Sequence, residues 1–230
     1  MKIVQLSRAF AAEVAQLHMA GQPGTFLTSL GADVLTVLYR VLPQSPVGFG
    51  YVALSNESGA ESNGPKSKIQ NPKSKIALGF VSATTSVGRL FAEMGTRRIA
   101  QILPPLLARF ARQPALILRS VQTLLYPFLG HGNQGNGTGT RAELLSIMVD
   151  PAARSQGIGA QLLQALLSEC TKRQIQWLDV TVDANDAGAR RFYERHGFSL
   201  AHQFTLYGRE MCGYKLAISL ANVEETRDGR

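Results

Sequence analysis

The stretch that most constrains the fold of this chain is SIMVDPAARSQGIGAQLL, residues 146–163. An apolar run ends at Asp150-Pro151, two glycines follow with one residue between them, and the apolar spacing then becomes helical. At the start of a helix the first backbone N–H groups have no partner within the helix, and the helix dipole is positive there. The stretch therefore predicts a strand, a turn and a helix, with the turn binding a phosphate or pyrophosphate.

The residues around the glycines exclude two common phosphate-binding motifs. A P-loop needs Gly-Lys-Ser/Thr at its end, but Gly159 is followed by Ala-Gln. A dinucleotide-binding fingerprint needs a third glycine at the position that Leu162 occupies. The pattern that remains, Arg/Gln-x-x-Gly-x-Gly/Ala, is met in full by RSQGIG at 154–159.

Apolar spacing elsewhere predicts helices and strands on both sides of this turn. Before it, the pattern predicts helices at 7–21 and 29–41 and a hairpin of two strands at 48–54 and 75–85. From the turn onwards it predicts a strand at 142–150, a helix at 157–173, a strand at 175–183, a helix at 186–196 and two closing strands. This order predicts a layered α/β (α+β) fold.

Two segments interrupt this pattern and carry most of the positive charge. The chain has 24 Lys and Arg against 16 Asp and Glu, a net charge of +8. The polar segment 55–75 contributes +2 and repeats PKSKI, which predicts a flexible lysine-rich surface insertion. The segment 87–129 contributes +5 and has arginines at helical intervals, with Pro104–Pro105 and Pro114 predicted to divide it into about three short helices. We expect the second segment to be an ordered basic helical insertion.

Composition argues against several classes of protein. No apolar run is long enough to cross a membrane, and charged residues interrupt the N-terminal region where a secretion signal would be apolar. The two cysteines have no motif spacing, and the four histidines form no metal-ligand pattern. We therefore expect a soluble cytoplasmic protein without a metal.

Two motifs in the second half resemble one family. VDPAARSQGIGAQLL is similar to the acyl-CoA-binding motif of the GNAT superfamily of acyl-CoA-dependent N-acyltransferases. DAGARRFYERHGF resembles the next motif of that superfamily, at the expected distance. The two motifs lie within residues 142–200, a quarter of the chain. The resemblance implies a mixed, mostly antiparallel central sheet flanked by helices, and a single domain over 1–230 that includes both insertions.

The resemblance also implies a co-substrate and its binding residues. Acetyl-CoA is the expected acyl donor, with its pantetheine between the splayed strands beside the turn and its pyrophosphate on the amides of the turn. Backbone amides near Ile147 and Met148 are expected to polarise the thioester carbonyl, and Arg154 to add a charge-assisted contact to the pyrophosphate. The full set of expected cofactor-binding residues is Ile147, Met148, Val149, Arg154, Ser155, Gln156, Gly157, Ile158, Gly159, Ala160 and Asn185.

Two residues are candidates for catalysis. Tyr193 matches the family position that protonates the leaving thiolate, and the alternative is an aromatic side chain packed beside Phe192 and Phe198. Glu143 is a candidate general base for the amine, directly or through water, and the alternative is an exposed carboxylate at a strand edge.

One position departs from the family pattern. The family's asparagine falls on Asp186, and Asn185 lies one place earlier. An ionised aspartate accepts hydrogen bonds but cannot donate them, and it would repel the anionic parts of CoA. Either Asn185 replaces the missing contact through a shifted turn, or the contact is absent.

The acceptor is not specified by these motifs. We expect a small-molecule or peptide amine and keep a homodimer open, with neither a nucleic acid nor a membrane as the favoured partner. One hypothesis is that 87–129 covers the acceptor site and that its arginines favour an anionic acceptor. The alternative function is a catalytically silent CoA-binding module whose basic helices bind nucleic acid or a membrane surface.

Overall fold

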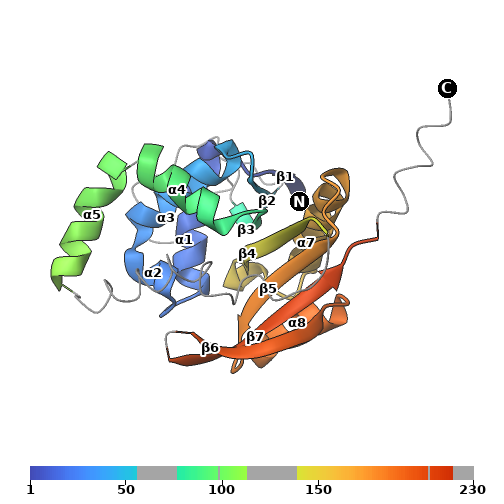
Figure 1. The fold of residues 1–230 in the computed structure, drawn as a ribbon. Coiled ribbons are helices and arrows are strands. Elements are labelled where there is room, and N and C mark those ends of the chain that lie inside the picture. Colours follow the sequence, from blue (N-terminus) through green and yellow to red (C-terminus); the bar gives the residue numbers. More distant parts are fainter. Residues whose placement is uncertain (56–76, 98, 113–138, 207, 220–230) are drawn as a thin grey trace.

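The computed structural model describes residues 1–55, 77–97, 99–112, 139–206 and 208–219 (Figure 1). Its strands are β1 (Lys2–Gln5), β2 (Gly48–Leu54), β3 (Ala77–Thr84), β4 (Arg141–Val149), β5 (Trp177–Asp183), β6 (Ser199–Leu206) and β7 (Arg209–Ala217). Its α-helices are α1 (Ala11–Gly21), α2 (Phe26–Leu30), α3 (Ala32–Val41), α4 (Val87–Arg97), α5 (Ile99–Arg112), α7 (Ile158–Lys172) and α8 (Ala187–Arg195). Short 3₁₀ turns span Arg8–Phe10, Leu42–Gln44 and Pro151–Ala153.

The described strands form one seven-stranded sheet in the order β1-β2-β3-β4-β5-β7-β6. Within it β4 and β5 run parallel, and every other neighbouring pair is antiparallel. The parallel pair is joined through α7, as a crossover between parallel strands requires. The predicted mixed, mostly antiparallel sheet with flanking helices is therefore confirmed.

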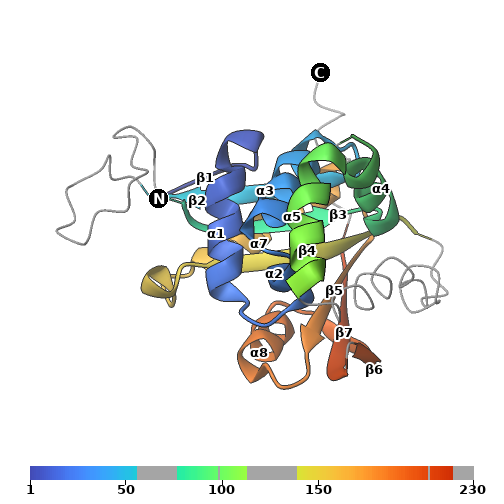
Figure 2. The same cartoon turned by 90° about the vertical axis from the view of Figure 1, so that its left-hand side faces the viewer.

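Each face of the sheet carries its own apolar core. Helices α1, α3 and α4 bury side chains against one face, where Val14, Leu35 and Phe80 lie in a single cluster. Helix α7 covers the other face, with Leu162, Leu163 and other apolar side chains completely buried. Each such leucine stabilises the fold by about 2 kcal/mol relative to an exposed one. Figure 2 looks onto the first layer, in which α3 contacts α1, α4 and α5.

Most predicted elements are present, with boundaries within a few residues, and three differences have clear causes. The helix predicted at 29–41 is two helices, because Gly31 has a φ of 92° that an α-helix does not allow. The short edge strand β1 was not predicted, since four residues give too little alternation to recognise. The predicted break at Pro104–Pro105 is wrong, because α5 continues through both prolines while packing against α3 and α4.

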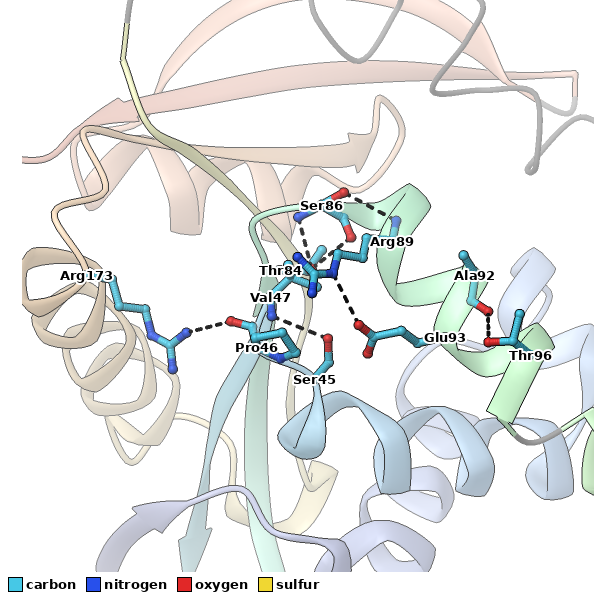
Figure 3. A network of polar contacts seen from close by, with 10 residues as sticks. All are labelled: Ser45, Pro46, Val47, Thr84, Ser86, Arg89, Ala92, Glu93, Thr96 and Arg173. Atoms are coloured by element: carbon cyan, nitrogen blue, oxygen red, sulfur yellow. Dashed lines mark hydrogen bonds and ion pairs between the residues drawn. The ribbon is translucent and has the colours of Figure 1, made fainter.

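A polar junction fixes the start of α4 directly after β3 (Figure 3). The Ser86 hydroxyl accepts a hydrogen bond from the Arg89 amide at 3.3 Å, which caps the first turn of α4. The Ser86 amide donates to Thr84 Oγ1 at 3.2 Å, and Arg89 pairs with Glu93 one turn later. These contacts hold α4 at the end of β3 next to the middle of the sheet.

The two insertions are only partly described. The predicted lysine-rich insertion at 55–75 lies outside the described residues apart from its first position. The basic insertion at 87–129 is helical over α4 and α5, and its remainder after Arg112 also lies outside them. Among the described residues, no helix is long and apolar enough to cross a membrane.

Candidate active site

Strand β4 carries a β-bulge where it pairs with β3, and its pairing with β5 ends next to that bulge. Ser82 of β3 pairs with Ser146, whereas the next residue of β3 pairs with Leu144, so Leu145 is the extra residue. The pairing of β4 with β5 ends at Leu144 and Val180. Because β4 continues to Val149, its last residues run beside β5 without pairing to it. The structure thus has the splay that a pantetheine arm would require.

Backbone groups of β4 face this splay. The Asp150 amide donates to the Leu78 carbonyl beyond the end of the ladder with β3, at 2.8 Å. Amide directions alternate along a strand, so the amides of Ile147 and Val149 point away from β3 and toward the unpaired side. By the same alternation the Met148 amide faces β3, and its side chain is buried against α1 near Gly21.

The turn after β4 is shaped by two residues in the left-handed region. Ser155 has a φ of 64° and Gly157 a φ of 74°, so the chain folds back sharply before α7 begins at Ile158. Only glycine adopts this conformation without strain, which explains why position 157 is glycine. Arg154, Ser155, Gln156 and Gly157 are all exposed, as a binding loop requires.

The first turn of α7 presents the free amides that the sequence predicted. The first intrahelical bond runs from the Gln161 amide to the Gly157 carbonyl, at 3.1 Å. The amides of Gly157 to Ala160 therefore precede that bond and have no partner in the helix. Arg154 brings a positive charge to the same loop, and its Nε donates to the Val149 carbonyl at 3.3 Å. An anion at this position would meet amides, the helix dipole and a guanidinium together.

Helix α8 brings the second motif against the first. A Cβ placed on Gly159 would lie 3.4 Å from Phe192 Cε2 and 3.8 Å from Val149 Cγ2, so a larger side chain would push α8 away from α7. Tyr193 follows and is 5% exposed, with its ring 5.3 Å from that of Phe192 and 5.2 Å from that of Phe198. Burial, and secondarily the Asp186 carboxylate, raise the pKa of the Tyr193 hydroxyl above its usual value. The hydroxyl therefore stays protonated at neutral pH.

Glu143 lies at the other end of β4, in register with Asp179 of β5 and Thr84 of β3. Burial, and then the charge of Asp179, raise the pKa of Glu143 to about 7. Asp179 is itself held by Arg141, whose Nε lies 3.0 Å from Oδ2. Glu143 is thus a half-buried carboxyl that gains or loses its proton near neutral pH, whereas a carboxylate at an exposed edge would keep its ordinary pKa.

Sequence reasoning missed Asp179 and Arg141 as neighbours of Glu143. All three lie on strands that pair only in the folded sheet, where Glu143 and Asp179 face each other across the parallel ladder. The alternating pattern of IQWLDVTVD places Asp179 on the more exposed side of its strand, but nothing in that pattern indicates which residue it faces.

The position that departs from the family pattern has a structural use. Asp186 is the N-cap of α8, and its Oδ1 accepts a hydrogen bond from the Ala189 amide at 2.9 Å. A carboxylate suits this position because a cap needs an acceptor and no donor. Asn185 is exposed, and its backbone amide donates to Asp183 Oδ1 at 2.8 Å.

The described residues contain no group of three or more His, Cys, Asp or Glu side chains placed to hold a metal. The arrangement instead offers a turn with exposed amides beside Arg154, a gap between strands lined by free amides, a protonated tyrosine and a carboxyl of near-neutral pKa. Chemically, the turn can bind a phosphorylated ligand, free amides can polarise a carbonyl, and the tyrosine and the carboxyl can each exchange a proton.

Comparison with known proteins shows similarity to one family. Residues 124–198 match the family model of the acetyltransferase (GNAT) family. A segment of 60 residues is 42% identical to the ribosomal protein bS18 alanine N-acetyltransferase of Escherichia coli K12, and the same values hold for the Shigella flexneri protein. The match spans 26% of this chain and 40% of each relative, so less than half of their length is covered.

Solved structures share the fold over most of the chain. The ribosomal-protein-S18-alanine N-acetyltransferase of Escherichia coli superposes with a TM-score of 0.52 at 16% identity, covering 97% of both chains. Arabidopsis thaliana NAA60, solved with acetyl-CoA, gives a TM-score of 0.56 at 13% identity, covering 94% of this chain and 98% of the other. The predicted resemblance to the GNAT superfamily and the predicted fold class are confirmed.

Proposed function

Since the chain carries a GNAT acetyltransferase domain, we propose that it transfers an acetyl group from acetyl-CoA to a primary amine. The observation that carries this proposal is the end of the β4–β5 pairing at Leu144 and Val180, directly before the amides of Ile147 and Val149 and the glycine turn. A phosphate-binding turn alone would support a binding module. When such a turn continues into a gap with free amides, it supports an acyl donor. The phosphates of that donor bind at the turn, and its reactive thioester lies further along the gap.

Acetyl-CoA fits this surface in two parts. We propose that the amides of Gln156 to Ala160, together with Arg154, hold the pyrophosphate at the start of α7. Ser155 and Gly157 allow this by their left-handed backbone, which brings the turn close to the ligand. The pantetheine then follows β4, where Ile147 and Val149 bind it. We assign no cofactor contact to the Asp186 carboxylate because it already caps α8, and Asn185 is the exposed neighbour able to donate.

Three groups of this chain take part in the proposed reaction: the Ile147 amide, Tyr193 and Glu143. The amine nitrogen attacks the thioester carbon, and the amide of Ile147 donates to the carbonyl oxygen as negative charge develops on it. The C–S bond then breaks, and Tyr193 gives its proton to the leaving thiolate. The proton that the attacking nitrogen loses as the amide forms restores the Tyr193 hydroxyl. The raised pKa of Tyr193 keeps that proton available at neutral pH.

Glu143 is proposed as the base that takes the proton from the amine. It lies four residues before Ile147, which is about 13 Å along an extended strand, so we expect the proton to pass through water. With a pKa of about 7, Glu143 can accept a proton from a peptide α-ammonium, whose pKa is about 8. A lysine side chain, with a pKa of about 10.4, would release its proton far less readily.

A peptide α-amine is therefore the acceptor that we propose first. The relatives support the same choice, since the name of the Escherichia coli enzyme states that it acts on an alanine of a ribosomal protein. The hypothesis that arginines of 87–129 select an anionic acceptor concerns side chains that the described residues largely leave out, and it stays a hypothesis.

The test is a thiol-release assay with acetyl-CoA and a panel of amines that contains short peptides with a free N-terminus, lysine derivatives with a blocked α-amine and small amines. Wild type is compared with Tyr193→Phe, which keeps the ring between Phe192 and Phe198. We expect the variant to bind acetyl-CoA normally and to turn over about 100-fold more slowly or worse, as for loss of a general acid.

Three outcomes would count against parts of the proposal. Equal rates for wild type and variant would remove Tyr193 from the mechanism. Release of thiol only with lysine derivatives would overturn the α-amine assignment. Binding of acetyl-CoA without turnover of any amine, together with salt-dependent retention on DNA or anionic vesicles, would support the silent CoA-binding module instead.

A further inference from the structure

A buried polar cluster lies behind the β4 bulge, on the face of the sheet that α1 and α3 cover. His18 of α1 is 0% exposed, and its Nδ1 lies 2.5 Å from the hydroxyl of Tyr39 on α3. Ser146 Oγ lies 3.5 Å from the same His18 nitrogen. The rings of His18 and Tyr39 both pack on Phe80 of β3, at centroid distances of 6.4 and 5.1 Å.

Burying these polar side chains in the apolar core lowers the stability of the folded protein. Burial lowers the pKa of His18 to about 4, so the ring is neutral at physiological pH. Its Nε2 atom is buried without a hydrogen-bond partner among the described residues. Burial also raises the pKa of Tyr39, and the nearby Ser146 and Ser82 hydroxyls lower it by a smaller amount. Leucine and phenylalanine would fill the same space without an unpaired polar atom, so stability alone does not account for these residues.

The hydrogen bonds of the cluster lead to the bulge itself. The Ser146 hydroxyl donates to the carbonyl of Leu145, the extra residue of β4, at 2.7 Å. The Tyr39 and Ser146 hydroxyls both lie within hydrogen-bond reach of His18 Nδ1, at 2.5 and 3.5 Å, so the series connects His18, Tyr39 and Ser146 and ends on the Leu145 carbonyl. A bulged residue is left out of the ladder, so a side-chain donor replaces a contact that the neighbouring strand does not supply.

We propose that the His18–Tyr39–Ser146 series is a positioning device for the acyl-binding strand. It pins the bulge at Leu145 and thereby sets where β4 leaves β5 and where the amides of Ile147 and Val149 lie. Without it, the bulge can move along β4, and a shift of one residue reverses which amides face the gap. The proposal rests on the proposed acetyl transfer for its kinetic consequence, but its structural part can be tested without turnover.

The experiment compares two hydroxyl deletions with two matched controls. Tyr39→Phe keeps the ring that packs on Phe80, and Ser146→Ala removes the donor to Leu145. Tyr51→Phe is the tyrosine control, because its hydroxyl donates to Glu169 at 3.1 Å on the opposite face of the sheet. Ser45→Ala is the serine control, because Ser45 is 5% exposed and its hydroxyl accepts from the Val47 amide away from β4.

Hydrogen exchange over residues 144–150 measures the bulge directly. We expect both deletions to speed exchange there by about fivefold or more, the usual loss from one hydrogen bond, while both controls leave this segment unchanged. In kinetics, we expect kcat to fall about 10- to 100-fold from misplaced amides, while the Kd for CoA stays within about threefold because the pyrophosphate site on α7 is intact.

Unchanged exchange over 144–150 in both deletions would overturn the proposal, whether or not the protein proves to be an acetyltransferase. So would a loss of kcat that the tyrosine and serine controls reproduce, since it would follow from general destabilisation. If wild type transfers no acetyl group, the proposed function fails, and the exchange comparison still decides whether the series pins the bulge.

Discussion

Replacing Glu143 with glutamine should make the protein more stable and less active, and both effects should depend on pH. In the unfolded chain Glu143 ionises near its usual pKa of 4.5, whereas burial and Asp179 raise its pKa in the folded protein to about 7. That gap corresponds to at most about 3.5 kcal/mol, at about 1.4 kcal/mol per pKa unit. The value is an upper bound because Glu143 is partly exposed and water screens its charge.

The direction in which stability changes with pH depends on whether the folded or the unfolded chain holds the proton of Glu143. Below pH 4.5 both states hold the proton, so wild type and Glu143→Gln should have the same free energy of unfolding. Between pH 4.5 and 7 the unfolded chain releases the proton while the folded protein keeps it, so wild type loses stability as the pH rises. Above pH 7 the ionised carboxylate carries its full cost, and the variant should melt several degrees higher than wild type.

Thermal unfolding at pH 4.5 and pH 8 tests this pH dependence: the measured quantity is the difference in Tm between Glu143→Gln and wild type. Glu169→Gln is a control of opposite sign. Burial raises the pKa of Glu169, but hydrogen bonds from Arg173 and Tyr51 and the charges of Arg173 and Lys172 outweigh it and leave that pKa low. Glu169→Gln should therefore destabilise the protein above pH 4.5, where wild type gains from the ionised carboxylate.

The effect on activity is measured with the same variant, Glu143→Gln. If Glu143 is the base, kcat/KM of wild type should rise through pH 7, and Glu143→Gln should lose about 100-fold or more at pH 8. A Tm difference that is the same at both pH values would refute the burial of an ionising carboxyl at position 143. An unchanged rate at pH 8 would refute its role as base and leave it a structural carboxyl beside Asp179.

Three further predictions concern the turn at 154–157 and α8. Gly157→Ala should destabilise the protein by about 1 kcal/mol, because its φ of 74° strains any residue with a Cβ, and calorimetry should show weaker CoA binding; unchanged stability would contradict the left-handed conformation. Arg154→Ala should change Tm little, since the side chain and its hydrogen bond to the Val149 carbonyl are exposed, and it should weaken CoA binding more at low salt than at high salt; the same loss at all salt concentrations would argue against a charge contact. Asp186→Ala should lower stability by about 1 kcal/mol through loss of the α8 cap, and Asp186→Asn, which keeps an acceptor oxygen, should restore most of it; equal losses would contradict the capping role.

Local patterns predicted much of this architecture because the features involved are close in sequence. The glycine turn, the amphipathic helix at 157–173 and the hairpin before the turn depend on backbone preference and on which side of an element is apolar. Where two local rules compete, the sequence is a poorer guide. Proline disfavours a helix interior, yet α5 continues through Pro104–Pro105 while contacting α3 and α4.

The sequence by itself determined that a strand ends in a glycine-containing turn, that a helix follows, and that Tyr193 lies on the next helix. Only the tertiary structure decided what those elements face. Three features arise between segments that lie apart in the chain: the bulge at Leu145, the end of the β4–β5 pairing and the close approach of Phe192 to Gly159. The pKa of Glu143 depends in the same way on Asp179, 36 residues later in the sequence. Burial and pairing partners are properties of the assembled sheet, and a periodic pattern along one strand carries no information about the residue across from it.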